Sequence, residues 1–497
     1  MDRREFLKVG AGATVAGTIV SGHADSTVRA AATEPRTTTT PAVLKTYTPE
    51  DHRRRLENIG VCERGIRKCL RRHLITSYLP GQCIYNLCEY PLKGWEPNDY
   101  DEQELDRLRD HGIGLIQLHS EWRDELGLFG GSHFVPHNPA GFRRFLDMVH
   151  KRGMKVIVYM STYYFGQGDP AFRKEWTRGH EWKNFCMNLA VCSAASVGWR
   201  AYLLPQLARL LDDYGIDGLY NDAAGVSNDR PPTSDEVRPF KEGPTDEAVT
   251  ADLFALIYAE VKRRGGIVKV HSGGANAPPT KLPVYDYLWV GELVGDVDGL
   301  REAVKNHAPY VVPCIDRCWG PKVEREEELY LQAVPYMQFP LLMAGRPLTG
   351  ERGFVPGVHY YTNNYRELRQ TWEYYKAHPE GPHRYGWWDS VPAGRPEARP
   401  THARWLKQYL PMVEEGTWAY LDISDSDLFA QPLPKDVVAS AFANRDMYLV
   451  LANYGRVPAE IVTSGEYVLA ADPKSAPKSR WNLEGRSLYI LQRSSTC

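Results

Sequence analysis

Carboxylates stand directly after two short apolar runs in the middle of the chain. Asp222 ends the segment that begins with the run Gly218 to Tyr220, and Glu292 follows the run Tyr287 to Val290, with Asp296 four residues beyond. One ionised carboxylate can stabilise the positive charge that develops on a sugar as a glycosidic bond breaks. A second, protonated carboxyl can give its proton to the leaving oxygen. These residues therefore indicate acid/base chemistry on a glycoside, if the fold brings two of them together.

Polar and aromatic side chains occupy the same kind of position, at the end of an apolar run. Aromatic rings suit the apolar faces of sugars, and imidazoles and charged groups can bind hydroxyls. Each also has a structural explanation, because rings and histidines fill cores and adjacent opposite charges form ion pairs. The substrate-binding candidates are His119, Trp122, Tyr164, Asn221, His271, Asp316, Arg317 and Trp319.

Strand-like runs alternate with helical patterns from about residue 80 to 350, and these elements must position the candidates. The predicted strands cover 83–87, 115–118, 156–160, 218–220, 267–270, 287–290, 310–312 and 341–343. An open doubly wound sheet would alternate in the same way, but no glycine-rich phosphate loop follows the first strand, and eight units favour closure. We therefore predict an α/β fold, a (β/α)₈ barrel. Its working residues should lie at the C-terminal ends of the strands, where the candidates stand.

The pattern changes on either side of this barrel. From about residue 415, short alternating runs separated by turn residues predict a C-terminal antiparallel β-sandwich. Residues 351–414 are rich in Trp, Tyr, His and Pro and are expected to form an irregular extension of the barrel. The expected order is thus a signal peptide at 1–32, a linker and helical preface at 33–79, the catalytic barrel at 80–350, the extension at 351–414 and the sandwich at 415–497.

The N-terminus resembles a twin-arginine export signal. Arg3 and Arg4 precede Phe6, and the modest apolar stretch from Val9 to Val20 is too short for a comfortable membrane span. Small residues further on provide cleavage sites. We expect a protein exported by the twin-arginine pathway, periplasmic or extracellular, and without a membrane anchor once the signal is removed.

The nine cysteines include two pairs that could form disulfides. Cys62 and Cys69 would lie more than ~10 Å apart on one predicted helix, beyond the reach of a disulfide. Two other pairs could bridge across a loop, and the sequence does not decide between bonded and free forms. They are Cys83 with Cys88, and Cys186 with Cys192.

Two segments resemble the α-galactosidase-like glycoside hydrolases, the melibiase group. They are FVPHNPAGFRRFLDMVHKRGMKVIVYMSTYY, at 134–164, and YGIDGLYND, at 214–222. The resemblance implies a barrel with a C-terminal sandwich and gives Asp222 the role of nucleophile. The group has a Lys two residues before that position, where this chain has Tyr220, and an Arg followed by an Asp after the sixth strand. We expect Glu292 to be the general acid/base because it stands at the strand end, and Asp296 is the alternative.

Charge and motif spacing narrow the expected partners. Lys and Arg number 60 against 62 Asp and Glu, so no basic excess favours nucleic acid. His119, Asp222, His271 and Asp316 could instead hold a metal, but no H-x-H or H-E-x-x-H pairing supports this. The sequence predicts a retaining glycosidase with a carbohydrate substrate and no metal or cofactor. The alternatives are a non-catalytic carbohydrate-binding barrel and a metal-dependent hydrolase on the same fold.

Overall fold

The computed structural model describes most of the chain after residue 45. The described residues are 46–87, 96–118, 122, 134–136, 138–181, 189–222, 246–271, 282–290, 297–305, 307, 309–313, 327–345 and 399–494. All of them belong to one of the chain's two units, Val43–Cys497.

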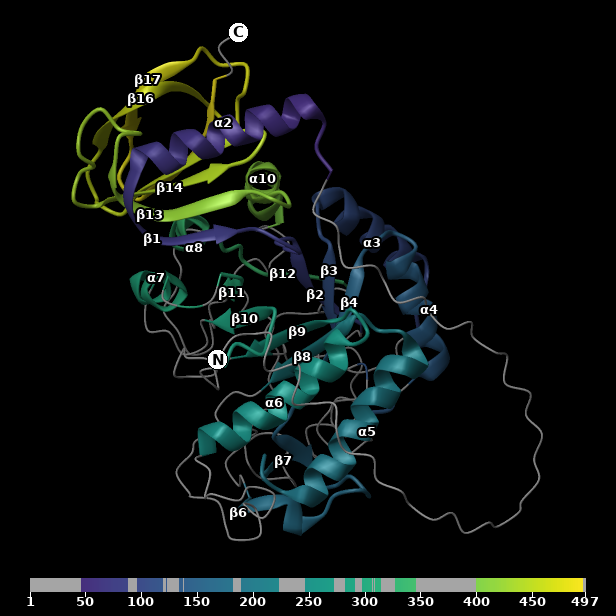
Figure 1. Cartoon of the computed structure of the whole chain (residues 1–497). Helices are drawn as coiled ribbons and strands as arrows, with labels where there is room; N and C mark the ends of the chain where they lie inside the picture. The colour runs from purple at the N-terminus through teal and green to yellow at the C-terminus, as the bar shows by residue number, and fades with distance from the viewer. Residues whose placement is uncertain are drawn as a thin grey trace, which may run out of the picture. The chain divides into compact units, whose positions relative to one another are not determined.

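Eight parallel strands form the central sheet (Figure 1). Their order is β11-β10-β9-β8-β4-β3-β2-β12, so the strands follow one another in chain order and the last returns beside the first. This arrangement is the (β/α)₈ barrel. The strands are β2 (Gln82–Asn86), β3 (Leu115–Leu118), β4 (Lys155–Met160), β8 (Gly218–Asp222), β9 (Ile267–His271), β10 (Tyr287–Val290), β11 (Val311–Pro313) and β12 (Leu342–Gly345).

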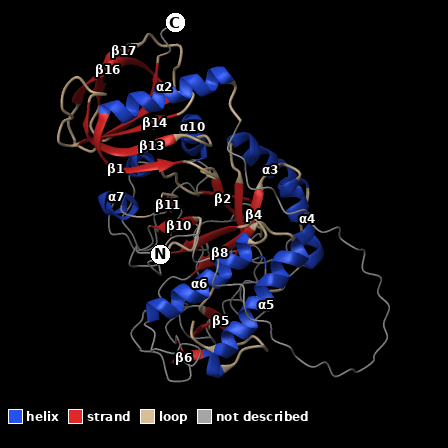
Figure 2. Ribbon diagram, viewed as in Figure 1, coloured by secondary structure: helices blue, strands red, loops and turns tan. Residues whose placement is uncertain are grey.

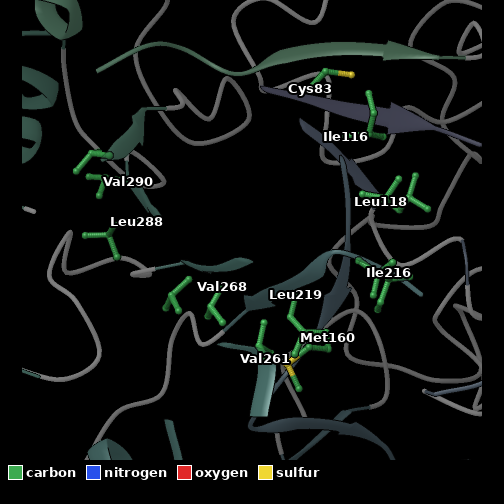
Figure 3. Packing of buried hydrophobic residues seen from close by; sticks show 14 of the residues in the cluster. Cys83, Ile116, Leu118, Met160, Ile216, Leu219, Val261, Val268, Leu288 and Val290 are labelled. Carbon is green, nitrogen blue, oxygen red and sulfur yellow. The ribbon is translucent and has the colours of Figure 1, made fainter. Parts of the chain in front are cut away.

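Alternate residues of these strands face inward and fill the barrel. The interior cluster draws on all eight strands, which shows that the sheet curves around one packed core. Its members are Ile84, Leu115, Ile157, Tyr159, Tyr220, Ile267, Tyr287, Trp289, Val312, Leu341 and Met343. The residues between them face the surrounding helices, and Figure 3 shows several, among them Leu118, Leu219 and Val268.

Helices separate the strands in the sequence, and Figure 2 shows them in blue around the barrel. Local signals explain where two of them begin. The α4 helix is capped by Asn138 and has a proline at its first position. The capping box of α3 uses Asn98 with Asp101. The helices are α3 (Asp99–His111), α4 (Pro139–His150), α5 (Val197–Tyr214), α6 (Asp246–Lys262), α7 (Val297–Lys305) and α8 (Glu327–Ala333), the last followed by η4 (Val334–Tyr336).

Close approach of two backbones requires glycine at the start of β8. A Cβ at Gly218 would lie 1.9 Å from the carbonyl oxygen of Ile267, and φ at Gly218 is 150°. Only glycine tolerates both conditions. This glycine lets β8 pair tightly with β9, and the pairing places Asp222 opposite His271.

A small antiparallel sheet occupies the long loop after β4. It is formed by β5 (Tyr164–Gly166), β7 (Leu189–Cys192) and β6 (Thr177–Glu181), with η2 (Lys174–Trp176) before β6. The middle strand, β7, pairs with both others. The loop that leaves the third barrel strand is therefore a folded element, and it buries its aromatic residues.

The predicted C-terminal antiparallel β-sandwich is confirmed, and its strands join into one seven-stranded sheet. The order is β1-β13-β14-β15-β18-β16-β17. One face contributes to the same apolar cluster as the barrel and its helices, and the other forms a separate cluster under α2 (Pro49–Gly65). The strands are β1 (Ile66–Leu74), β13 (Trp418–Ser426), β14 (Val437–Ala443), β15 (Met447–Asn453), β16 (Ala459–Leu469), β17 (Lys478–Leu483) and β18 (Ser487–Arg493).

The helical preface predicted before the barrel contains a strand as well as a helix. The helix α2 is present, but the chain leaves it after Gly65 and continues as β1, which pairs with β13 more than 340 residues later. Five of the nine residues of β1 are basic or His, and such residues suit the edge of a sheet. The expected irregular extension lies outside the described residues up to 398, and beyond it the chain is helical. Those helices are α10 (Arg399–Tyr409) and η7 (Leu410–Val413).

Cys83 and Cys192 carry free thiols, so neither of the two possible disulfides forms. In the part of the chain that the structure describes, no helix has both the length and the apolar character needed to cross a bilayer.

Candidate functional site

Asp222 lies at the C-terminal mouth of the barrel and points inward. It ends β8 two residues after Tyr220, which belongs to the interior cluster, so both side chains lie on the same face of the strand. Its side chain is 20% exposed, which leaves it accessible to a ligand. Tyr159 donates a hydrogen bond from Oη to Oδ2 of Asp222 over 3.0 Å.

His271 approaches the other oxygen of the same carboxylate. Its Nδ1 lies 3.3 Å from Oδ1 of Asp222, and its side chain is 9% exposed. With a proton on Nδ1 the imidazole donates to the carboxylate, and a protonated ring adds an ion pair. Asp222 is therefore held on both oxygens, by Tyr159 from β4 and by His271 from β9.

Aromatic rings form the floor beneath these groups. The rings of Trp289 and His271 lie 5.1 Å apart at an interplanar angle of 31°. The ring of Tyr220 lies 5.1 Å from that of Trp289 and 5.8 Å from that of Tyr159. Trp289 and Tyr220 are 8% and 1% exposed, so water is excluded below Asp222. Electrostatic interactions are stronger in such surroundings than in water.

Ser161 connects the loop after β4 to the end of β8. Its Oγ donates to the backbone oxygen of Asp222 over 2.7 Å. The same Oγ accepts hydrogen bonds from the backbone nitrogens of Tyr163 and Tyr164, at 3.2 and 2.8 Å. The position of Asp222 is thus tied to the conformation of the neighbouring loop.

Asn221 holds this loop as well, and the structure does not support its predicted role in substrate binding. Its side chain is outside the barrel, because Tyr220 and Asp222 on either side face inward. It is 1% exposed, and its Oδ1 accepts from both the backbone nitrogen and the hydroxyl of Thr162, at 3.0 and 2.7 Å.

Trp122 and Tyr164 pack in the core, so the prediction that they are stacking platforms for sugar is not supported either. Trp122 is 0% exposed, stacks on Phe142 and donates from its indole nitrogen to the backbone oxygen of Tyr159 over 3.1 Å. Tyr164 is 4% exposed and lies in β5. Both rings contribute to packing around the site instead of to its surface.

Of the predicted site residues, the structure brings Asp222 and His271 together. Six others lie outside the described residues, namely His119, Glu292, Asp296, Asp316, Arg317 and Trp319. Tyr159 and Trp289 were not among the predicted site residues. The sequence signal for both was their place near the C-terminal end of a predicted strand, where a barrel carries its working residues.

The described residues show no arrangement that would hold a metal ion. In that part of the chain, no group of three or more His, Cys, Asp or Glu side chains is suitably placed. The geometry of Asp222, Tyr159 and His271 fits a carboxylate held for reaction with a ligand that enters the barrel mouth.

Comparison with solved structures shows the fold at low sequence identity. The α-glucosyl transfer enzyme XgtA is 13% identical over 84% of this chain and 100% of its own, with a TM-score of 0.54. The trehalulose synthase MutB from Pseudomonas mesoacidophila is 12% identical over 84% of this chain and 100% of its own, with a TM-score of 0.52. An α-galactosidase from Geobacillus stearothermophilus is 10% identical over 86% of this chain and 56% of its own, with a TM-score of 0.48.

The first two likenesses support the barrel fold and do not single out the melibiase group. No protein-family model and no curated protein matches the sequence.

Proposed function

We propose that this chain is an exported glycoside hydrolase that cleaves O-glycosidic bonds with retention of configuration. Asp222 is the nucleophile and Glu292 the general acid/base. One observation carries the proposal: the Asp222 carboxylate is held at the C-terminal mouth of the barrel, with a donor on each oxygen and a dry aromatic floor beneath it. In this fold that end of the barrel carries the chemistry.

The proposed reaction has two steps. In the first, an oxygen of Asp222 forms a bond to the anomeric carbon while the glycosidic bond breaks, and the leaving oxygen takes the proton of Glu292. In the second, Glu292 removes a proton from water, and the resulting hydroxyl displaces Asp222 from the same carbon. A carboxylate oxygen has two lone pairs, so accepting a hydrogen bond from Tyr159 or His271 does not by itself prevent an oxygen of Asp222 from attacking carbon.

The strand register supports Glu292 as the partner of Asp222. Asp222 pairs with His271 in the sheet, and His271 pairs with Trp289, so β10 ends next to the site, two residues before Glu292 in the sequence. Retention requires the two carboxyl groups to stand ~5 to 5.5 Å apart, and ~6.5 to 9.5 Å would indicate inversion. Asp296 is the alternative acid.

The substrate proposed first is an α-glucoside, since the solved structures with this fold include an α-glucosyl transfer enzyme and a trehalulose synthase. The test is turnover of a panel of chromogenic glycosides, beginning with α-glucosides. Asp222→Asn should lower kcat by at least about a thousandfold, because no group remains to form the covalent intermediate. Proton NMR should show that the first-formed sugar has the same anomeric configuration as the substrate.

A matched control is Asp217→Asn. Asp217 lies just before β8, accepts from the backbone nitrogen of Val156 and is expected to affect stability more than turnover. Sugar binding by calorimetry without turnover of any glycoside would indicate the non-catalytic barrel instead. Activity that is lost on chelation would indicate the metal-dependent hydrolase.

Glu292→Ala tests the acid/base. Glycosides with poor leaving groups should lose most activity, whereas activated aryl glycosides keep their first step, and azide should rescue the second. If Asp296→Ala shows this pattern instead, Asp296 is the acid. If neither variant shows it, both carboxylates are structural.

Export is proposed from the twin arginines. Replacing Arg3 and Arg4 with Lys should leave precursor in the cytoplasm, as measured by cell fractionation with the wild-type chain as control. Unchanged export would refute the signal.

A further inference from the structure

A lysine is buried inside the barrel below the site. Lys269 is 0% exposed and lies on β9 between Ile267 and His271, so its side chain faces inward. Its Nζ donates to Oε1 of Gln82 over 3.2 Å. Gln82 belongs to β2, four steps away from β9 in the strand order of an eight-stranded barrel, which is the opposite wall. The lysine therefore crosses the interior.

The ammonium lies beneath the aromatic floor of the site. Nζ is 5.4 Å from the ring centre of Trp289 and 6.0 Å from that of Tyr220. Both rings contact the imidazole of His271, with centroid distances of 5.1 and 6.4 Å. A column thus runs from Lys269 through the two rings to His271 and then to Asp222.

Electrostatics explains why this cation matters to the site. The barrel interior screens charge less than water does, so an ammonium held there acts strongly on nearby charges. Among the described residues, Asp222 carries a negative charge on the same inner face. In the strand register Lys269 is opposite Tyr220 and Asp222 is opposite His271. The two charged residues are therefore offset by two residues along the paired strands, on the same inner face.

We propose that Lys269 is a positioning residue for Asp222, whose charge below the aromatic floor favours the ionised carboxylate and disfavours a second positive charge on His271. The catalytic part of this inference rests on the proposed function, and the electrostatic part does not. In the part of the chain that the structure describes, the groups of the column that carry or exchange charge are Lys269, His271, Asp222, Tyr159 and Tyr220.

The experiment replaces the cation with a neutral side chain of similar length, Lys269→Met. Side-chain NMR follows the titration of each imidazole, and His271 is assigned by the signal that disappears in His271→Gln. Without the nearby positive charge, His271 should bind its proton more readily. Its titration midpoint should rise by about half a pH unit or more.

Lys262→Met is the matched control. Lys262 lies on the outside of the barrel in α6, where it pairs with Asp286 at 3.0 Å, and its loss should leave the His271 midpoint unchanged. Gln82→Met is a second variant that keeps the lysine but removes its amide acceptor. It should shift the His271 midpoint in the same direction by a smaller amount. If Lys269→Met fails to fold, the His271 midpoint in Gln82→Met tests the inference instead.

Turnover provides the second readout. The acid limb of the pH profile of kcat/KM should move to higher pH in Lys269→Met, because Asp222 then takes up a proton more easily. An unmoved His271 midpoint in the folded variants overturns the inference, whatever the chain does with glycosides. A shifted midpoint in a protein that cleaves no glycoside supports the electrostatic coupling and refutes only the catalytic proposal.

Discussion

Oη of Tyr159 lies 3.0 Å from Oδ2 of Asp222, and this hydrogen bond joins the third barrel strand to the fourth at the mouth of the barrel. The tyrosine ring is fixed from below, since it packs 5.8 Å from the ring of Tyr220. Its hydroxyl therefore reaches Asp222 from a rigid part of the core. A donor placed in this way favours the ionised carboxylate and limits its rotation.

Removing this donor should impair the reaction without unfolding the chain. We expect Tyr159→Phe to lower kcat/KM by about 10- to 100-fold, since a hydrogen bond to a charged group contributes about 1.5–3 kcal/mol. The acid limb of the pH profile should also move to higher pH. The control is Tyr163→Phe, which loses a buried hydrogen bond to Thr250 instead. Equal kinetic losses in the two variants would show that Tyr159 has no special relation to Asp222.

Asn221 should matter for stability. Asn221→Ala leaves the backbone nitrogen and hydroxyl of Thr162 without their acceptor in a buried position, which we expect to cost about 1–3 kcal/mol in the free energy of unfolding. Urea denaturation measures the loss, with Asn482→Ala at an exposed position as control. A raised KM with unchanged stability would restore the predicted contact with substrate.

Glu104 and Arg399 form an ion pair that ties α3 to α10, and its carboxylate is buried. The Glu104 side chain is 1% exposed and lies 2.8 Å from Arg399. Burial acts to raise the pKa of Glu104, but the hydrogen bonds and charge of Arg399, with help from Arg107, leave it below its usual value. Arg399→Met should destabilise the fold by about 3–5 kcal/mol, because the carboxylate stays buried with less compensation.

Two comparisons check this effect. Arg404 lies on the same helix as Arg399 and forms an exposed pair with Glu327 of α8, so Arg404→Met should cost less than about 1 kcal/mol. The double variant Glu104→Gln with Arg399→Met should recover part of the loss. Thermal and urea denaturation measure all three, and equal losses from the two arginine variants would contradict the prediction.

A buried histidine pair should make the fold sensitive to acid. His402 is 0% exposed, and its Nδ1 lies 2.9 Å from Nε2 of His111. Burial, reinforced by the neighbouring positive groups, lowers the pKa of His402 to about 3 and that of His111 to about 4. The unfolded chain, whose histidines titrate near 6.5, binds protons in this range that the folded chain does not.

Stability is therefore complete above about pH 6.5 and falls as the pH drops toward these values. For His402 alone the loss at pH 5 is about 2 kcal/mol. We expect His402→Gln to lower stability at pH 8 but to flatten its fall toward pH 5, as measured by urea denaturation across pH. His52→Gln, at an exposed position on α2, should follow the wild type. A His402→Gln curve parallel to the wild type would exclude the pair as the cause.

Much of the barrel could be predicted from the sequence because its signals are local. Leu115–Leu118 and Tyr287–Val290 form strands with the predicted limits. Asn138 caps its helix with its side chain, and Gly215 ends α5 in the left-handed conformation that glycine favours. The position of Asp222 at a strand end followed from the same patterns.

Other features depend on residues far apart in the chain. Nothing local in Ile66–Leu74 indicates its partner, because β13 lies beyond the barrel in sequence. Trp122 and Tyr164 stand at strand ends as a sugar platform would, but the helix and small sheet that bury them are assembled from distant segments. An aromatic residue suits either setting, so its role depends on what packs against it.

The sequence by itself determined the type and order of the barrel elements, because hydrophobic periodicity, caps and glycines act over a few residues. Only the tertiary structure decided which face of each strand is inside, since closure of the sheet sets that phase for all eight strands together. That decision put Tyr159, His271 and Lys269 on the same side as Asp222 and placed Asn221 outside. The chemistry of a carboxylate depends on such neighbours, and together with Asp222 they come from three different strands, β4, β8 and β9.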